Sequence, residues 1–200
     1  GYKIEIGDMH YNFWENRLGC DSLIIENIDS SNKFSVGSFS IIGIGWLRIL
    51  FQGNMNTSAL TEAEIDAQNV LFNFHKTQYL LSAYQVHLSL PDSELIGDSI
   101  KYYVSTSDEQ FFSKSKFRQT RFRFDIPKIK IIGLDCPGLT KGNIYKARSI
   151  NIRDIFADIL VNEDKPYDTT SSNPLMPNEF FLSIKDTIKV SVLEIPTVTI

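Results

Sequence analysis

Three histidines, His10, His75 and His87, are the side chains of this 200-residue chain best suited to proton transfer near neutral pH. They are dispersed along the sequence and show no metal-ligand spacing. Neither Cys20 nor Cys136 lies in a CxxC pair, and the GxSxG nucleophile motif does not occur. The sequence therefore predicts no catalytic residue, no metal ligand and no cofactor.

Basic residues gather in one segment, residues 114–130, which carries seven lysines and arginines against a single acid. The net charge of this basic ribbon is +6, while the whole chain is −4, so the remaining residues sum to −10. A polarised surface of this kind usually faces a partner. The ribbon therefore supplies the residues predicted to bind a partner: Lys116, Arg118, Arg121, Arg123, Lys128 and Lys130.

The ribbon alternates like a strand, so the direction of each side chain can be predicted. Phe122 and Phe124 fall on one face together with other apolar side chains, and that face is expected to meet the core. Arg121 and Arg123 fall on the opposite face. They are predicted to be an exposed pair.

Three interpretations of the ribbon stay open. It fits an exposed strand that charge keeps soluble, or a docking face for an acidic protein, including a second copy of the chain. It also fits a single-stranded nucleic-acid site, in which Phe117 would stack on a base. The acidic remainder of the chain opposes this last alternative, because it would repel a long polyanion.

The elements that must position these residues are mostly strands. Ile is abundant (25 residues) and Ala scarce (6), which favours β-structure. A capping box and apolar residues at helical spacing nevertheless predict one helix over 61–82. A second stripe predicts another over 152–160, and the polar, proline-containing stretch 162–178 is expected to be a long loop.

The predicted fold is a single α+β domain over residues 1–200, rich in strands. About ten strands would form a sandwich or a curled, mostly antiparallel sheet with the two helices packed on it. No internal repeat is evident. No apolar run reaches the roughly 18 residues that span a bilayer, and the composition of 42% hydrophobic and 22% charged residues is that of a globular protein. The abrupt ends favour a chain excised from a longer one.

The function predicted from these features is that of a non-catalytic structural or protein-interaction module. Such a module would be one oligomeric subunit of a larger assembly, for example a virus or phage particle or a secretion apparatus, with protein partners or self-assembly. Nucleic-acid binding is the first alternative. A carbohydrate-active or other hydrolytic enzyme is the second, since paired carboxylates can come from distant strands. With only two cysteines, reduced thiols and a cytosolic or particle-associated location are favoured over secretion.

Overall fold

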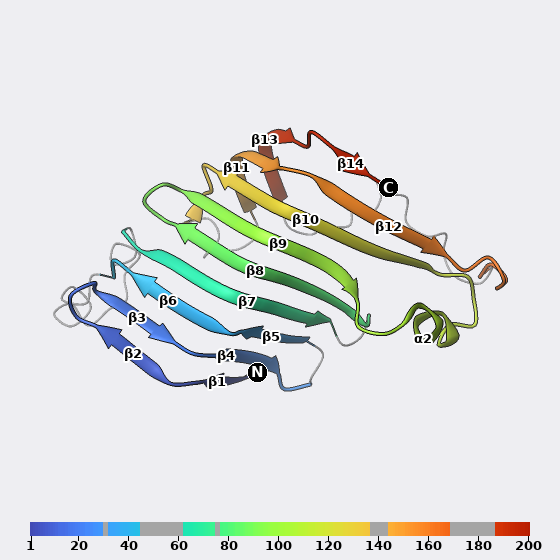
Figure 1. Cartoon of the computed structure of the whole chain (residues 1–200), viewed down its shortest axis with the longest axis horizontal. Helices are drawn as coiled ribbons and strands as arrows, with labels where there is room; N and C mark the ends of the chain where they lie inside the picture. The colour runs from blue at the N-terminus through green and yellow to red at the C-terminus, as the bar shows by residue number, and fades with distance from the viewer. Residues whose placement is uncertain (30–31, 45–61, 75–76, 137–143, 169–186) are drawn as a thin grey trace.

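The computed structural model describes residues 1–29, 32–44, 62–74, 77–136, 144–168 and 187–200, and these residues form one sheet (Figure 1). Neither predicted helix is present: strands occupy the described parts of both segments, so the α+β prediction is wrong. The single helix within the described residues is α2, Asp108–Ser113. His75 and residues 169–178 of the predicted loop lie outside the described residues.

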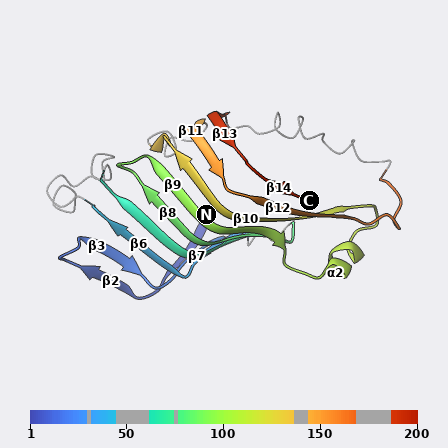
Figure 2. The same ribbon diagram turned by 45° about the horizontal axis from the view of Figure 1, so that its top comes forward.

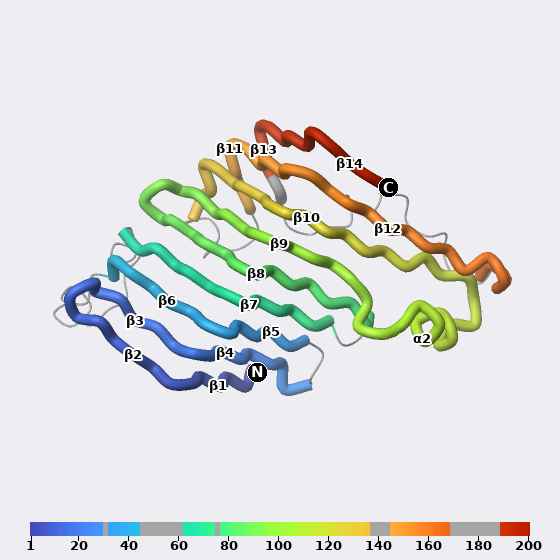
Figure 3. The backbone as a smooth tube through the Cα atoms, viewed as in Figure 1, coloured from blue at the N-terminus to red at the C-terminus, as the bar shows by residue number. Residues whose placement is uncertain are grey.

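The strands follow one another along the chain and are mostly antiparallel neighbours (Figure 3). Only the pairs β11 with β13 and β12 with β14 are parallel. The strand bounds are β1 Tyr2–Ile6, β2 Met9–Asn12, β3 Arg17–Cys20, β4 Leu23–Asn27, β5 Asn32–Val36, β6 Ser38–Ile42, β7 Glu64–Phe74, β8 Tyr79–Ser89, β9 Glu94–Val104, β10 Thr120–Ile132, β11 Ile144–Ile152, β12 Ile155–Val161, β13 Thr187–Glu194 and β14 Val198–Thr199.

Several of these strands are the two halves of one longer strand. β1 and β2 pair with β4 and β3 in one unbroken register, in which Ile4 lies opposite Ile25 and Tyr11 opposite Leu18. The same continuity joins β5 with β6, β11 with β12, and β13 with β14. The described sheet is therefore built of nine long strands. Four of them, β7 to β10, are unbroken antiparallel neighbours near its centre.

All nine long strands are interrupted or altered at the same level of the sheet. When the register is followed from strand to strand, this bend line begins at Gly7 in the first long strand and ends at Thr197 in the last. Where it crosses β7 and β9 the backbone is left-handed, with φ of 53° at Asn69 and 51° at Ser99. Figure 2 shows the resulting curvature of the sheet. The full line is Gly7, Ser22, Gly37, Asn69, Tyr84, Ser99, Pro127, Asp154 and Thr197.

The bend line shifts the alternation of side chains by one residue. In a regular strand Gly97 and Ile100 would face opposite sides. Here a Cβ on Gly97 would lie 2.9 Å from Cδ1 of Ile100, so the two residues share a face. The left-handed Ser99 between them accounts for the shift. It acts like the extra residue of a β-bulge, so that the side chains after it alternate one residue out of step.

This shift keeps one face of the sheet apolar on both sides of the bend. Each long strand repeats the pattern apolar-x-apolar-x-x-apolar-x-apolar, a repeat that is hidden in the sequence because its spacing is irregular. Across the strands, one row of paired residues on this apolar face is Ile4, Ile25, Phe34, Phe72, Leu81, Tyr102, Phe124 and Ala157. A second row is Tyr11, Leu18, Ile41, Ile65, Leu88, Leu95, Ile131, Ile150 and Leu193.

The apolar face lies on the inner side of the bend. Cys20, Val36, Ala67 and Ala83 flank the bend line on this face and are buried. Tyr84 lies on the line itself and is 60% exposed. Small residues next to the line allow the two halves of the sheet to approach each other closely.

The same shift explains the helices that the sequence wrongly predicts. In β7 the apolar residues Ala67 and Val70 are three apart because the bend falls between them. In the strand formed by β11 and β12, Ile152 and Ile155 are likewise three apart. Spacings of two and three in succession resemble helical periodicity, although both segments are strands.

The helix α2 closes one end of the sheet. Ser107 caps it by accepting a hydrogen bond from the backbone N–H of Gln110. Phe111 and Phe112 then pack on Tyr79 and Val104, which gives the buried aromatic cluster of this end. This packing fixes the first turn of α2, and with it the carboxylate of Asp108, beside β10.

The molecule exposes more surface than a compact one. Its accessible surface is 13565 Å². A compact monomer of the same length would expose about 9,600 Å². Burial is concentrated at the bend, beneath α2 and at the opposite end of the central strands, where Ile44, Ala63, Ser89 and Leu134 are buried.

Candidate functional site

Arg121, predicted to point outward, is buried at the junction of β10, β12 and α2. Its residue exposure is 2%, whereas Phe122, predicted to meet the core, is 38% exposed. The prediction of an outward Arg121 is therefore wrong. The cause is α2, which covers this part of β10 and brings Asp108 over the strand, while Asp158 approaches from β12.

Two carboxylates hold the two arginines of this ion-pair cluster. Nη1 of Arg121 lies 2.7 Å from Oδ2 of Asp158, and its Nε lies 3.1 Å from Oδ1 of Asp108. Nη2 of Arg123 donates to Oδ1 of Asp108 at 2.7 Å, and its Nη1 lies 3.8 Å from Oδ2 of Asp158. The cluster is charge-balanced, with two cations and two anions, so it offers no net charge to a ligand.

The electrostatics of the cluster keep Arg121 and Asp158 ionised. Burial acts to lower the pKa of Arg121, but hydrogen bonding to Asp158 and the attraction of Asp108 outweigh it, so this pKa is raised. The hydrogen bond from Arg121 lowers the pKa of Asp158. A general acid needs a raised carboxyl pKa, so the shift at Asp158 is the opposite of what acid catalysis requires.

Other basic residues of the ribbon are also engaged within the chain. Nζ of Lys128 lies 3.6 Å from Asp98 and Nζ of Lys130 lies 2.7 Å from Glu94, both on β9. Arg118 donates to the hydroxyl of Tyr167 at 2.7 Å and lies over its ring. Lys116 is exposed, with its Nζ 5.8 Å from the ring centroid of Phe117. Acids of neighbouring strands thus offset much of the ribbon's charge, and its role in partner binding stays a prediction.

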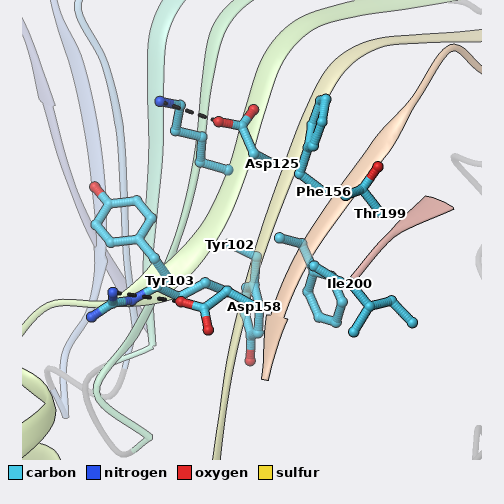
Figure 4. Close-up of a pocket in the computed structure, with 11 residues that line it drawn as sticks. Tyr102, Tyr103, Asp125, Phe156, Asp158, Thr199 and Ile200 are labelled. Carbon is cyan, nitrogen blue, oxygen red and sulfur yellow. Dashed lines mark ion pairs between the residues drawn. The ribbon is translucent and has the colours of Figure 1, made fainter. Parts of the chain in front are cut away.

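A shallow hollow of 310 Å³ lies beside the cluster, between β9, β10, β12 and β14, and residues of both faces line it. Figure 4 shows Asp125 and Asp158 in ion pairs with Lys101 and Arg123, and Phe156 and Ile200 on the side of β14. Its charged groups are all paired with one another. The hollow therefore offers no unpaired charged side chain to a ligand.

A second hollow, of 370 Å³, is lined by Asp66, which pairs with His87. Nδ1 of His87 lies 2.8 Å from Oδ1 of Asp66 across adjacent strands. His10 lines the same hollow from β2. Within the described residues no group of three or more His, Cys, Asp or Glu side chains could hold a metal ion. Cys20 and Cys136 are both free thiols.

The two edges of the sheet, formed by β1 with β2 and by β13 with β14, are open. Among the described strands, none pairs with the outer side of β1 and β2 or of β13 and β14. Large apolar side chains are exposed at both ends, up to 93% for Trp14 and 88% for Ile200. At the edge of β1 and β2 these residues are Tyr2, Ile4, Ile6, Met9, Tyr11, Phe13 and Trp14. At the edge of β13 and β14 they are Val192, Leu193, Ile195, Val198 and Ile200.

Sequence reasoning missed these edges because nothing local distinguishes an edge strand from a central one. It also missed Asp108 and Asp158, which lie 13 and 37 residues from Arg121 along the chain. The register of β12 against β10, which brings Asp158 opposite Arg123, depends on the whole sheet.

Comparison with known proteins gives little further information. A scan against models of protein families and a search of the curated proteins found no match. Among solved structures the chain is similar to LptH from Pseudomonas aeruginosa, the LptA homologous periplasmic component of the lipopolysaccharide transport device. The TM-score is 0.32 and the identity 7%, covering 66% of this chain and 76% of that one. At this level the likeness establishes no function. None of the described helices has the length and apolar character to span a membrane.

Proposed function

We propose that the protein is a non-catalytic interaction module whose open sheet edges join it to other protein subunits of an assembly. The exposed apolar side chains at both edges carry this proposal. An unpaired edge presents a row of backbone N–H and C=O groups, and natural proteins usually protect such edges with charge, proline or a covering element. Here charged residues such as Glu5 and Glu194 alternate along the edges with exposed Ile, Tyr, Leu and Val, and these apolar side chains favour pairing with another strand.

The electrostatics of the interior support the same proposal. The arginines and carboxylates that come together form ion pairs with one another, and the lowered pKa of Asp158 does not suit acid catalysis. Among the described residues, the edges therefore combine exposed apolar side chains with backbone N–H and C=O groups that no described strand pairs. Such surfaces favour association with another protein chain.

The experiment compares two substitutions at residues of equal exposure. Ile4 on edge strand β1 and Tyr84 at the centre of the sheet are both 60% exposed. Ile4→Lys places a charge in the edge contact, and Tyr84→Lys places the same charge on the central bend line. Each variant is expressed in the cells from which the protein comes, and the size of its native complex is measured by size-exclusion chromatography.

The expected result is a large complex for the wild type and for Tyr84→Lys, and a reduced one for Ile4→Lys. An unchanged complex in Ile4→Lys, or a wild-type chain that elutes as a monomer in the native extract, contradicts the proposal.

A further inference from the structure

We infer that the edge formed by β13 and β14 pairs antiparallel with the edge formed by β1 and β2 of a second copy of this chain, with Thr197 opposite Gly7. This inference rests on the proposed function and names the partner of its edges. In this register the bend line of one copy continues into the next, because Thr197 and Gly7 are the two ends of that line.

The apolar face continues across the junction in this register. Leu193 ends one apolar row and Tyr11 begins it, and the proposed pairing places these two residues opposite each other. Ile200, next to the last paired residue of β14, comes opposite Ile4 in the same way. Between them, Ile195 meets Met9 and Val198 meets Ile6. On the apolar face, the four apolar residues of one edge thus each meet an apolar residue of the other.

Other registers lose this match. A slip of one residue places Leu193 opposite His10 and Val198 opposite Glu5, because neighbouring residues face opposite sides. Parallel pairing with the bend lines aligned places Leu193 opposite Lys3 and Val198 opposite Asp8. A slip of two residues leaves the apolar side chains on one face. It brings Ile195 onto the bend line of the partner in one direction, and Val198 next to that line in the other.

Charge complementarity selects the same register. Glu194 comes opposite His10, and Lys189 comes level with Glu15, just beyond the end of β2. No like charges are paired directly, since Glu5 meets Thr199. A slip of two residues in one direction would bring Glu194 against Asp8, and two acids directly opposite each other destabilise a strand pair.

The strand directions make this contact repeatable. Seven long strands alternate from β1 to β10, the strand of β11 and β12 continues the alternation, and β13 and β14 run parallel to it. An antiparallel neighbour of β13 and β14 therefore runs in the direction of β1 and β2 of the first copy. Successive copies keep one orientation, and a head-to-tail contact that does not close generates a filament.

The register is tested by disulfide trapping between two purified variants in a background with Cys20→Ala and Cys136→Ser. One carries Tyr11→Cys and the other Leu193→Cys, and they are mixed and mildly oxidised. Directly opposed residues have Cβ atoms close enough for a disulfide, so the mixture is expected to cross-link about tenfold faster than a control mixture of Tyr11→Cys with Val192→Cys. Val192 is the neighbouring residue on the opposite face and is also exposed.

A charge exchange provides a second test on exposed side chains. Glu194→Lys is expected to weaken self-association about fivefold in sedimentation velocity at a pH where His10 is protonated, because it replaces an attraction between opposite charges with a repulsion. Adding His10→Glu is expected to restore association. Restoration requires that the two residues meet, so a double variant as weak as the single one contradicts the register.

Equal trapping with Val192→Cys, or disulfides that join two Tyr11→Cys chains, would overturn the inference. A purified chain that stays monomeric would overturn it as well. If Ile4→Lys still reduces the native complex in that case, the edges bind a different protein and the proposed function stands. If Ile4→Lys has no effect on the native complex, the proposed function itself fails.

Discussion

Arg121 illustrates how a residue selected for partner binding becomes part of the interior. Its position in an alternating strand predicts an outward side chain, and alternation does hold locally, since Arg121 and Arg123 share a face and both contact Asp108. That face is covered at Arg121 by α2 and open at Arg123, whose side chain is 40% exposed. One strand face therefore carries a buried cation and an exposed one, two residues apart.

The two arginines are expected to differ in their effect on stability. Arg121→Met removes a buried cation and leaves Asp108 and Asp158 without their main partner, so it should lower the free energy of unfolding by about 2 kcal/mol. Arg123→Met removes a more exposed member of the same cluster and should cost less than about 0.5 kcal/mol. Urea unfolding of both variants measures the difference. Equal losses would contradict the burial of Arg121.

At the scale of elements, the sequence allows the strands to be predicted better than their arrangement. The β-rich composition and the ribbon strand around Phe122 and Phe124 are confirmed. The two helices are wrong because the bend shifts the apolar alternation by one residue, which local periodicity cannot distinguish from a helical turn. The apolar repeat of the long strands can be recognised only from the strand register, which aligns Gly7 with Ser22 and Gly37.

The shift is testable through Gly97 and Ile100. Gly97→Ala introduces a Cβ 2.9 Å from Cδ1 of Ile100, closer than such atoms normally approach, and should cost about 1–2 kcal/mol by overpacking. Ile100→Val removes that Cδ1, so Gly97→Ala should cost less in the Ile100→Val background, where only the contact of 3.0 Å with Cγ2 of Ile129 stays tight. A double-mutant cycle by chemical denaturation measures the coupling. Additive effects would mean that the two residues do not share a face.

For the whole molecule, the open sheet leaves more surface in water than a compact fold would. The difference between 13565 Å² and the area expected for a compact monomer is not confined to one patch. Within the described residues, two features contribute to it: edge strands that have a neighbour on only one side, and an apolar face that is only half-buried away from the bend. The stability of the isolated chain should therefore depend strongly on the central strands β7 to β10.

The dependence of unfolding on urea is expected to reflect this architecture. The m-value scales with the surface exposed on unfolding, and this chain exposes less additional surface than a compact one. Its m-value, measured at a dilution where the chain is monomeric, should be about a sixth smaller than that of a compact protein of the same length. A value equal to that of a compact protein would show that the free chain buries more surface than the sheet described here.

The repeat shared by the nine long strands also bears on how such a chain can change in length. Since each strand repeats one pattern and meets its neighbours at one level, a hairpin of two such strands is a complete unit. Duplicating a hairpin would add two strands without altering the direction of the outer edges or the level of the bend. Losing a hairpin would remove two strands with equally little disturbance. A fold with this property can lengthen or shorten by gene duplication and deletion while keeping both of its ends.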